Sequence, residues 1–299
     1  MIIPARNAEC TLDRQLEALA QQDFREPWEI VVVDNGSTDG TRELVESWQA
    51  KLCHLRLIHE PRPGVNRARN AGVAAARADR ILLCDADDIV DAAWVRVLTS
   101  TLDEFDLLAG RLDYELLNTD HVRARTLARP LAEGLAVSWR RPWGMTCNLG
   151  FHRRVFDDLD GFDPAFERGG SDDVDFCLRA CAAGFSFGFA SDAVVHYRMR
   201  ARPLDHARQL YHYARASELL YRKHRARGAL DAYPPRTRWN LNTAQAFGLV
   251  CDLTKLGSRI GRERYLVRTA RFVGGIAGIV RHREPAVTAV EGKGTWPRS

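Results

Sequence analysis

Residues 81–88 have the sequence ILLCDADD, and this stretch gives the strongest indication of the fold. The apolar run predicts a buried strand, and it ends in three acids, Asp85, Asp87 and Asp88. Open α/β sheets bind their ligands at the carboxyl ends of the strands. Carboxylates at this position can hold Mg²⁺ or Mn²⁺, because these ions favour oxygen ligands. The alternative is a simple turn in which Asp88 or Asp91 caps the next helix, although a cap needs only one acid.

The first hundred residues alternate short apolar runs with helical patterns. Such alternation is typical of βα units, and it predicts an α/β fold whose mostly parallel sheet is flanked by helices. Further helices are expected late in the chain, where apolar residues recur at helical spacing. The predicted strands are 1–3, 28–34, 54–60, 80–88 and 106–117, and the predicted helices are 11–22, 37–52, 64–78, 91–105, 172–183, 204–227 and 240–281.

Charge is distributed unevenly along the chain. Residues 1–195 carry 22 Lys/Arg against 32 Asp/Glu, whereas residues 196–283 carry 19 against 5. An acidic body needs cations or specific partners before it holds phosphates, and a basic C-terminal region attracts anionic lipid surfaces or polyphosphates. The simpler interpretation of the basic region is a solvated helical face. Few aromatic residues are interleaved there for base stacking, so no nucleic-acid partner is expected.

Cysteine usage and hydropathy favour a cytoplasmic protein. The seven cysteines lie in apolar stretches without a Cys-x-x-Cys pair, which indicates reduced thiols. The chain opens without the basic and apolar segments of a signal peptide. No segment reaches the ~20 apolar residues of a membrane span. The run Phe272–Val280 is too short to cross a bilayer, but its flanking arginines would suit a position in a membrane interface, as would packing on the body.

A second acidic strand end occurs in VVVDNGSTDGT, residues 31–41. Asp34 ends a buried apolar run and could accept a hydrogen bond from the imide N–H of uracil or thymine. A plain strand-to-helix loop capped by Ser37 or Thr38 accounts for the same letters. No Gly-x-x-x-x-Gly-Lys motif follows a strand, so the loop is not a P-loop.

A third acidic group lies in GGSDDVDFCLRA, residues 169–180. Asp172, Asp173 and Asp175 repel one another, and a position at a helix start lowers that cost because the helix dipole favours anions there. One interpretation is that these acids only cap the N-terminus of the helix. The functional interpretation is a general base that removes a proton from an acceptor hydroxyl.

Together these motifs resemble the family-two glycosyltransferases of the GT-A fold, and the resemblance runs from Ile2 to about Tyr197. Six segments look like family motifs and follow the family's order, which makes the match specific although each segment alone is weak. They are IIPARNAE at 2–9, VVVDNGSTDGT at 31–41, GVNRARNAG at 64–72, LLCDADD at 82–88, NLGFHRRVFDDLDGFDPAF at 148–166 and GGSDDVDFCLR at 169–179.

The resemblance implies roles for individual residues. Asp173 would be the catalytic base, and Trp143 and Asp172 would contact the acceptor. A divalent metal, Mn²⁺ or Mg²⁺, would be held by Asp87 and Asp85, with His196 as a further ligand. The alternatives are a surface position for Arg69, an ordinary core aromatic at Trp143 and a structural His196. The implied nucleotide-sugar-binding set is Pro4, Arg6, Glu9, Asp34, Asn35, Arg69, Asp85, Ala86 and Asp87.

Two features depart from the family pattern. The family has Glu then Asp at the base motif, whereas this chain has Asp172 then Asp173, so the identity of the base stays open between them. The first strand is short, because relatives have further apolar residues before IIP, and we expect the natural start to lie upstream of Met1.

The resemblance also implies a domain organisation. We expect a GT-A catalytic domain over 1–203, with nucleotide-sugar binding in 1–117 and the acceptor and base region in 118–203. A basic helical extension would follow over 204–283, and a flexible tail over 284–299.

The implied activity is inverting, metal-assisted transfer of a sugar from a nucleotide diphosphate sugar to an acceptor hydroxyl. UDP- or dTDP-sugars are favoured as donors, and the acceptor would be a glycan, a lipid-linked molecule or a small molecule of cell-envelope synthesis. The basic helices would hold the enzyme on an anionic membrane at the cytoplasmic face. The rival hypothesis is a non-catalytic phosphate- or nucleotide-binding module of the doubly wound type, which leaves the third acidic group unexplained.

Overall fold

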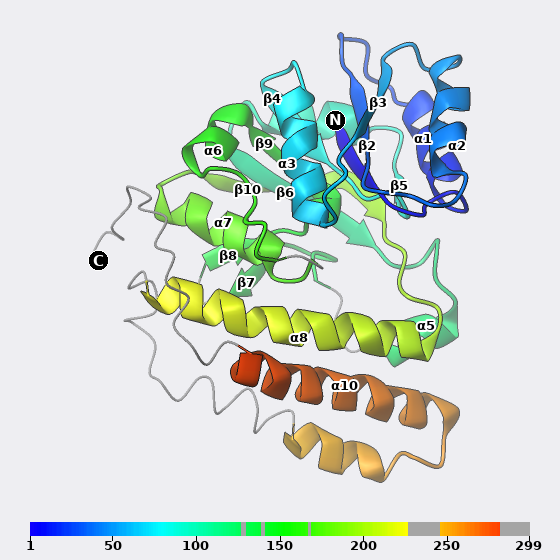
Figure 1. The fold of residues 1–299 in the computed structure, drawn as a ribbon, viewed down its shortest axis with the longest axis vertical. Coiled ribbons are helices and arrows are strands. Elements are labelled where there is room, and N and C mark those ends of the chain that lie inside the picture. The colour runs from blue at the N-terminus through cyan, green and yellow to red at the C-terminus, as the bar shows by residue number, and fades with distance from the viewer. Residues whose placement is uncertain (127–129, 139–140, 167–168, 227–245, 282–299) are drawn as a thin grey trace. The chain divides into compact units, whose positions relative to one another are not determined.

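The computed structural model describes residues 1–126, 130–138, 141–166, 169–226 and 246–281 (Figure 1). The chain divides into two compact units. The first comprises Met1–Leu117, Pro130–Glu167 and Asp172–Arg198, and it contains the sheet. The second comprises Asn118–Arg129, Arg168–Ser171 and Met199–Ser299.

The first unit is built on an eight-stranded sheet in the order β3-β2-β1-β4-β9-β6-β10-β5. Strands β1 to β4 are parallel, as are β6 and β10, while β9 is antiparallel to both neighbours and β5 is antiparallel to β10. The predicted α/β fold with a mostly parallel sheet is therefore confirmed. The strands are β1 (Ile2–Ala5), β2 (Ile30–Asp34), β3 (Leu55–His59), β4 (Arg80–Leu83), β5 (Ile89–Val90), β6 (Leu107–Asp113), β9 (Leu149–His152) and β10 (Phe187–His196).

Burial explains why these segments are strands. Every residue of β2 is buried, as expected of a central parallel strand covered on both faces. An aromatic cluster joins β9 to α7, because Phe151 lies 5.3 Å from Phe176, which stacks on Phe162 at 4.3 Å between ring centroids. The unit also contains a two-stranded sheet, β7 (Ala136–Ser138) and β8 (Arg141–Trp143), the 3-10 helix η1 (Thr146–Asn148), and the helices α1 (Leu12–Ala20), α2 (Thr41–Gln49), α3 (Val65–Ala75), α4 (Trp94–Thr101), α6 (Arg153–Asp158) and α7 (Asp172–Ala182).

Helices α2 and α4 do not begin with the side-chain caps that the sequence suggested as alternatives. Helix α2 begins at Thr41 with Gly40 as its N-cap residue and no side-chain cap, so neither Ser37 nor Thr38 caps it. Helix α4 has Ala93 as its N-cap residue, again without a side-chain cap. Capping by Asp88 or Asp91 is therefore wrong, and the acids after β4 have another role.

The second unit contains α5 (Asp120–Arg125), α8 (Pro203–Ala226), a helical segment at 246–253 and α10 (Arg259–Arg281). The long pair α8 and α10 lies side by side (Figure 1). Glycines permit this approach, since a Cβ added at Gly274 would lie 2.3 Å from the carbonyl oxygen of Tyr211. No helix of the described residues is both long and apolar enough to cross a bilayer.

One predicted helix is interrupted. The expected helix at 240–281 breaks at 254–258, because Ser258 ends a turn and accepts a hydrogen bond from the Gly261 N–H at 3.0 Å, as an N-cap residue does. The first residues of that prediction, 240–245, lie outside the described residues, as does residue 227 of the preceding helix.

Candidate active site at the strand ends

A buried ion-pair bridge joins two of the three predicted acidic groups. The Arg69 guanidinium, on α3, donates to the Asp172 carboxylate at 2.6 Å and reaches the Asp85 carboxylate at 3.4 Å. Burial would lower the pKa of Arg69, but Asp172, Asp85 and Asp173 outweigh that effect and raise it. Arg69 is buried, so it does not occupy the helix surface. The bridge ties the end of β4 to the start of α7, which are 87 positions apart.

The three acids of α7 have different surroundings. Asp172 is buried and paired with Arg69. Asp175 is buried and paired with Arg179 at 2.8 Å, and Arg179 also donates to two backbone carbonyls, so Asp175 anchors the helix. Asp173 is half-buried. Burial and the neighbouring Asp172 charge raise the pKa of Asp173 to about 7, which suits a general base near neutral pH.

A possible ligand set for a cation lies at the end of β4. One carboxylate oxygen each from Asp85 and Asp88, together with Cys147 Sγ, all lie within 4.8 Å of one another. Asp87 and His196, which were also predicted as metal ligands, are not members of this group. Burial raises the pKa of Asp85, and repulsion from Asp87 and Asp172 adds to the rise, while Arg69 only partly opposes it. A divalent cation would relieve this repulsion, so the acids fit such an ion.

The loop that carries these acids is fixed by Arg198. Its backbone N–H donates to Asp88 Oδ1 at 2.7 Å, and its Nε donates to the Asp87 carbonyl oxygen at 2.7 Å. Beneath the acids lies Cys147, whose pKa is raised well above its ordinary value by burial and by the nearby carboxylates. The sequence prediction missed the roles of Arg198 and Cys147. Of the residues around this loop that were not predicted as ligands, only Asp88 could have been inferred from the sequence, because it is the third carboxylate of ILLCDADD.

His196 and Trp143 lie on neighbouring elements. His196 ends β10 and is paired with Ile89, two residues after Asp87, while its Nδ1 lies 3.1 Å from Asp113 Oδ1. Trp143 ends β8, a strand that contacts α7. The Trp143 side chain is partly exposed, and its buried Nε1 has no hydrogen-bond partner among the described residues. A partly exposed indole with an unused donor differs from an ordinary core aromatic.

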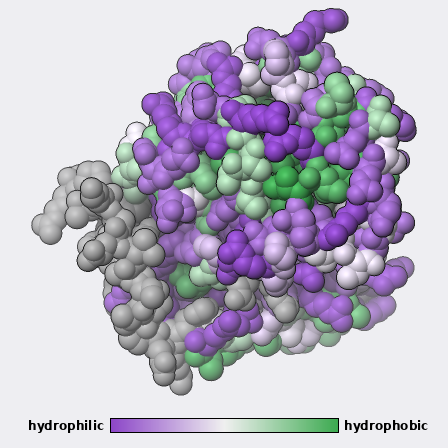
Figure 2. Space-filling view, turned by 45° about the horizontal axis from the view of Figure 1, so that its top comes forward, coloured by the Kyte–Doolittle hydropathy of each residue, from purple (hydrophilic) through white to green (hydrophobic). Residues whose placement is uncertain are grey.

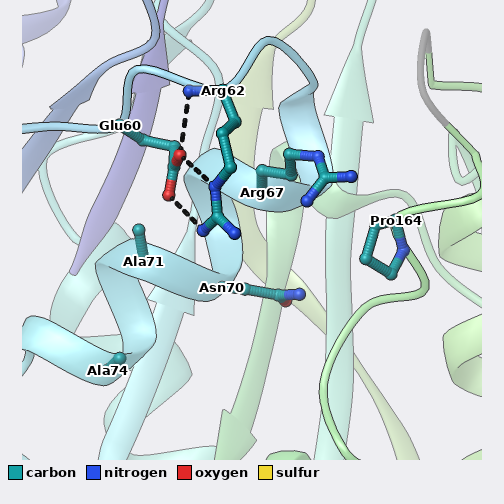
Figure 3. A pocket seen from close by; sticks show the side chains of 7 residues that line it. All are labelled: Glu60, Arg62, Arg67, Asn70, Ala71, Ala74 and Pro164. Carbon is teal, nitrogen blue, oxygen red and sulfur yellow. Dashed lines mark hydrogen bonds and ion pairs between the residues drawn. The ribbon is translucent and has the colours of Figure 1, made fainter.

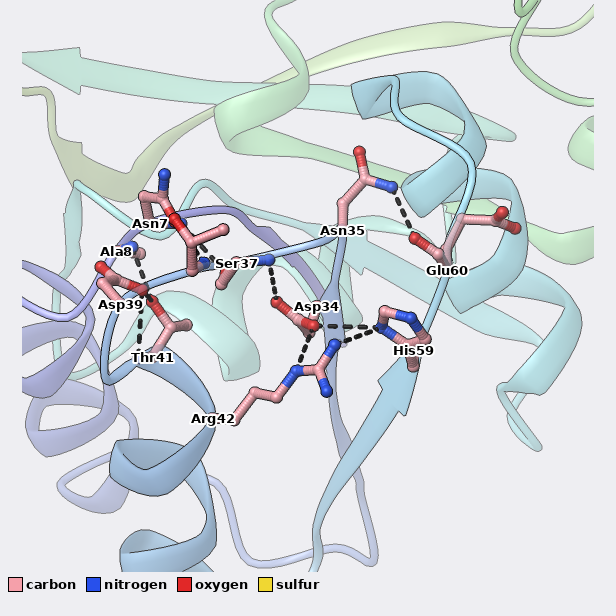
Figure 4. Close-up of polar contacts among 11 residues, drawn as sticks. Asn7, Ala8, Asp34, Asn35, Ser37, Asp39, Thr41, Arg42, His59 and Glu60 are labelled. Carbon is pink, nitrogen blue, oxygen red and sulfur yellow. Dashed lines mark hydrogen bonds and ion pairs between the residues drawn. The ribbon is translucent and has the colours of Figure 1, made fainter.

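Asp34 ends β2 and is held by three donors (Figure 4). Its carboxylate accepts from the Ser37 N–H at 2.9 Å and from Arg42 Nε at 2.6 Å, and His59 Nδ1 lies at 3.1 Å. Burial raises the pKa of Asp34, but these hydrogen bonds outweigh it and lower the pKa overall. Asp34 is therefore an ionised acceptor that is surrounded by donors.

The other five residues of the predicted donor set outside the Arg69 bridge and the metal ligands lie at the ends of β1, β2 and β4 or in the loops that follow these strands. Asn35 donates to the carbonyl oxygens of Glu60 and Arg62 and accepts from the Gly64 N–H, so its amide holds the loop before α3. Glu9 accepts from the Gly40 N–H at 3.0 Å. Pro4 lies in β1, Arg6 is exposed after β1, and Ala86 is buried between the two acids.

A separate hollow of about 390 Å³ lies along α3 (Figure 3). Arg69 is not among the residues that line it. Glu60 and Arg62 form an ion pair there, and this pairing lowers the pKa of Glu60 to about 2. The hollow is thus distinct from the acidic group at β4. Its lining residues are Glu60, Arg62, Arg67, Asn70, Ala71, Ala74 and Pro164.

The sheet order and the acids at the strand ends define a GT-A-like α/β fold. The sequence profile of glycosyl transferase family 2 matches residues 1–160, and the chain belongs to that family. Among curated relatives, the glycosyltransferase AglE of Haloferax volcanii is 28% identical over 198 residues, which cover 65% of this chain and 64% of AglE. The chain thus spans less than two thirds of that relative's length, and a smaller share of the other curated relatives with the strongest matches.

Solved structures show the same fold at low identity. TarS 1–349 of Staphylococcus aureus in complex with UDP-GlcNAc has a TM-score of 0.55 at 18% identity, and the match covers 100% of this chain and 96% of TarS 1–349. The mannosyltransferase PcManGT of Pyrobaculum calidifontis, in complex with GDP-Man and Mn²⁺, has a TM-score of 0.60 at 18% identity. The match covers 95% of this chain and 87% of the PcManGT chain.

Proposed function

We propose that this chain transfers a sugar from a nucleotide diphosphate sugar to an acceptor hydroxyl with inversion, with Asp173 as the general base. The observation that carries the proposal is the Arg69 bridge between Asp85 and Asp172, beside Asp173. The bridge joins Asp85, on the side proposed for the sugar donor, with Asp172, on the side proposed for the acceptor. Asp172 is committed to Arg69 and Asp175 to Arg179, so Asp173 remains as the base.

In this mechanism the acceptor hydroxyl loses its proton to an Asp173 oxygen and attacks the anomeric carbon. The bond to the diphosphate breaks in line with this attack, so no carboxylate nucleophile is needed. Arg69 Nε is buried and has no hydrogen-bond partner among the described residues, which leaves a donor for a diphosphate oxygen. Other N–H groups of Arg69 keep Asp172 and Asp85 in place.

The acids after β4 would hold the metal. Asp87 and Asp85 are the proposed ligands, with His196 as a further ligand, and an Asp88 oxygen lies within 4.8 Å of an Asp85 oxygen for another contact. A bound Mn²⁺ or Mg²⁺ would neutralise charge on the diphosphate leaving group. The solved structure of PcManGT contains GDP-Man and Mn²⁺, which supports this assignment by analogy.

The donors around Asp34 favour a pyrimidine nucleotide. Uracil and thymine present an N–H between two carbonyl groups, and this edge complements a carboxylate between two donors. Guanine has an amino group next to its ring N–H, and that amino group would meet the N–H groups of Arg42. The Asp34 side chain is 1% exposed, whereas those of Arg42 and His59 are 44% and 47% exposed, so a base would meet these two side chains first. UDP- and dTDP-sugars are therefore the proposed donors.

Replacement of Arg42 by Met should weaken binding of UDP and dTDP by roughly tenfold, because a charge-assisted hydrogen bond is lost. Binding of GDP should stay unchanged or improve. Thermal shifts and calorimetry with the three nucleotides in Mn²⁺ measure how the affinity for UDP and dTDP changes relative to the affinity for GDP. Arg14→Met on the exposed side of α1 is the matched control. An equal loss for UDP and GDP would show that Arg42 does not read the base.

The acceptor side is proposed from Trp143 and the surroundings of Asp173. The flat apolar surface of a partly exposed indole suits the face of a sugar or polyol. TarS is named as a poly(ribitol-phosphate) β-N-acetylglucosaminyltransferase, which supports an acceptor of the cell envelope. We place the enzyme in the cytoplasm at the membrane's inner face, with residues 1–203 as the catalytic domain, 204–283 as the helical extension and 284–299 as a tail.

Release of nucleotide from UDP- or dTDP-sugars tests the proposed function. We expect Mn²⁺-dependent release that rises when an acceptor is present and is lost in Asp173→Asn. A non-catalytic nucleotide-binding module would bind UDP but release nothing above the uncatalysed rate. That outcome, over a broad panel of donors and acceptors, would contradict the transferase assignment.

A further inference from the structure

Exposed apolar side chains of the described residues are concentrated in one part of the second unit. The face in Figure 2 is mostly hydrophilic, with one group of hydrophobic residues to the right of its centre. Of the ten large exposed apolar residues in the described part of the chain, seven lie between positions 246 and 281. They are Phe247, Val250, Leu253, Leu266, Val273, Ile276 and Val280, with exposures from 36% to 72%.

Four of these residues form one stripe on α10. Leu266, Val273, Ile276 and Val280 are spaced by seven, three and four positions, which places them on a single helix face. The opposite face packs on α8, where a Cβ added at Gly274 or Gly278 would lie within 2.8 Å of an α8 carbonyl oxygen. Since α8 already covers that other face, the stripe is not needed to hold the helix pair together.

The segment 246–253 extends the apolar surface. Its Asp252 forms an ion pair with Arg268 of α10 at 2.8 Å, so the two helical segments lie against each other. Phe247, Val250 and Leu253 are exposed on this segment. The seven exposed apolar residues therefore lie on two adjoining helical segments, and together these residues are called the α10 face.

The exposed charges on the two segments that carry the α10 face have one sign. Residues 246–281 contain only two acids, Asp252 and Glu263, and both are buried in ion pairs. Glu263 contacts His121 of α5 at 2.8 Å and Arg125 at 3.4 Å. Among the described residues, the exposed charged side chains at the ends of the stripe are cationic, namely Lys255, Arg262, Arg281 and Arg259, the last of which pairs with Glu263 at 3.1 Å.

We propose that the α10 face docks on an anionic lipid bilayer, with its apolar stripe in the headgroup boundary and the flanking arginines against lipid phosphates. An apolar stripe flanked by cations is the pattern of helices that lie in a membrane interface. A second copy of this chain would oppose cations to cations, and a nucleic acid would leave the stripe in water. The proposal concerns binding and does not depend on transfer. If the proposed function also holds, docking brings the enzyme to a lipid-linked acceptor.

Cosedimentation of the full chain with vesicles tests the proposal. We expect binding to vesicles of 70% phosphatidylcholine and 30% phosphatidylglycerol at low salt, and little binding to pure phosphatidylcholine. Each arginine near an anionic surface contributes about fivefold, so Arg262→Gln with Arg281→Gln should weaken binding by about 25-fold. Val273→Gln with Ile276→Gln should weaken it by at least about tenfold.

Matched controls keep charge and hydropathy changes away from the α10 face. Arg14→Gln on α1 and Val137→Thr on β7 alter exposed residues of the first unit and should bind vesicles as the wild type does. Circular dichroism confirms that each variant folds, and UDP binding is measured separately. Equal binding by wild type and both double variants would overturn the proposal. So would a wild-type dimer that Val273→Gln with Ile276→Gln dissociates while vesicles remain unbound.

Discussion

Replacement of Asp173 by Asn is expected to lower the transfer rate by about 10²–10⁴-fold, the usual contribution of a general base. Donor binding should be retained, because Asp85, Asp87 and Arg69 are unchanged. Initial rates and UDP titrations measure the two effects. Asp158→Asn, an exposed acid on α6, is the matched control and should leave both unchanged. Normal turnover in Asp173→Asn would move the base to Asp172.

The raised pKa of Asp173 adds a pH dependence to this prediction. Its pKa rises from 3.8 to about 7, so the wild-type rate should increase as the pH rises through about 7 and the carboxyl ionises. Between about pH 4 and 7 the folded chain holds a proton that the unfolded chain has lost, so this group's contribution to stability falls as the pH rises. Asp173→Asn removes the loss of stability that comes from ionising the Asp173 carboxyl in the folded chain. The variant should therefore melt at a higher temperature than the wild type at pH 8, with little difference near pH 4.

Replacement of Arg69 by Met is expected to lower the free energy of unfolding by about 3–5 kcal/mol, because it leaves the buried Asp172 carboxylate without its partner. Denaturant unfolding measures the loss. Arg67→Met, two positions away on α3, removes a charge that forms no buried ion pair with the described residues and should cost far less. A loss below about 1 kcal/mol for Arg69→Met would contradict the role of the bridge.

A double variant separates the ion pair from simple packing. Asp172→Asn placed on top of Arg69→Met removes one stranded charge, so it should recover part of the lost stability. If the double variant were less stable than Arg69→Met alone, the cost would come from packing around the side chain. The coupling between Arg69 and Asp172 would then be absent.

Local pattern was enough to predict strands β1, β2, β3, β4 and β6 and the elements that carry the acids, whereas β5 and β9 were not predicted. Each apolar run that ends in an acid predicts a strand with a carboxylate at its carboxyl end, and Asp34 and Asp85 follow β2 and β4 directly. The start of α7 at Asp172 follows from its acidic first turn and apolar face. These features depend on residues close together in sequence, which periodicity describes well.

Contacts between distant segments could not be predicted in this way. Arg69 meets Asp172 across 103 positions, and Arg198 holds the loop at Asp87 across 111. No periodic pattern specifies which charged side chain is buried against which acid. Helix α5 was also missed, although Thr119 accepts a hydrogen bond from the Val122 N–H and so had the residue type of an N-cap.

Calorimetric titration of UDP, with and without Mn²⁺, tests the central claim most directly. We expect UDP to bind in Mn²⁺, and to bind at least about tenfold more weakly either without metal or in Asp87→Ala, because the diphosphate then faces carboxylates without an intervening cation. Asp91→Ala, beyond the end of β5, is the control and should bind as the wild type does. UDP binding that is equally tight with metal, without metal and in Asp87→Ala would contradict a metal and diphosphate site at the end of β4.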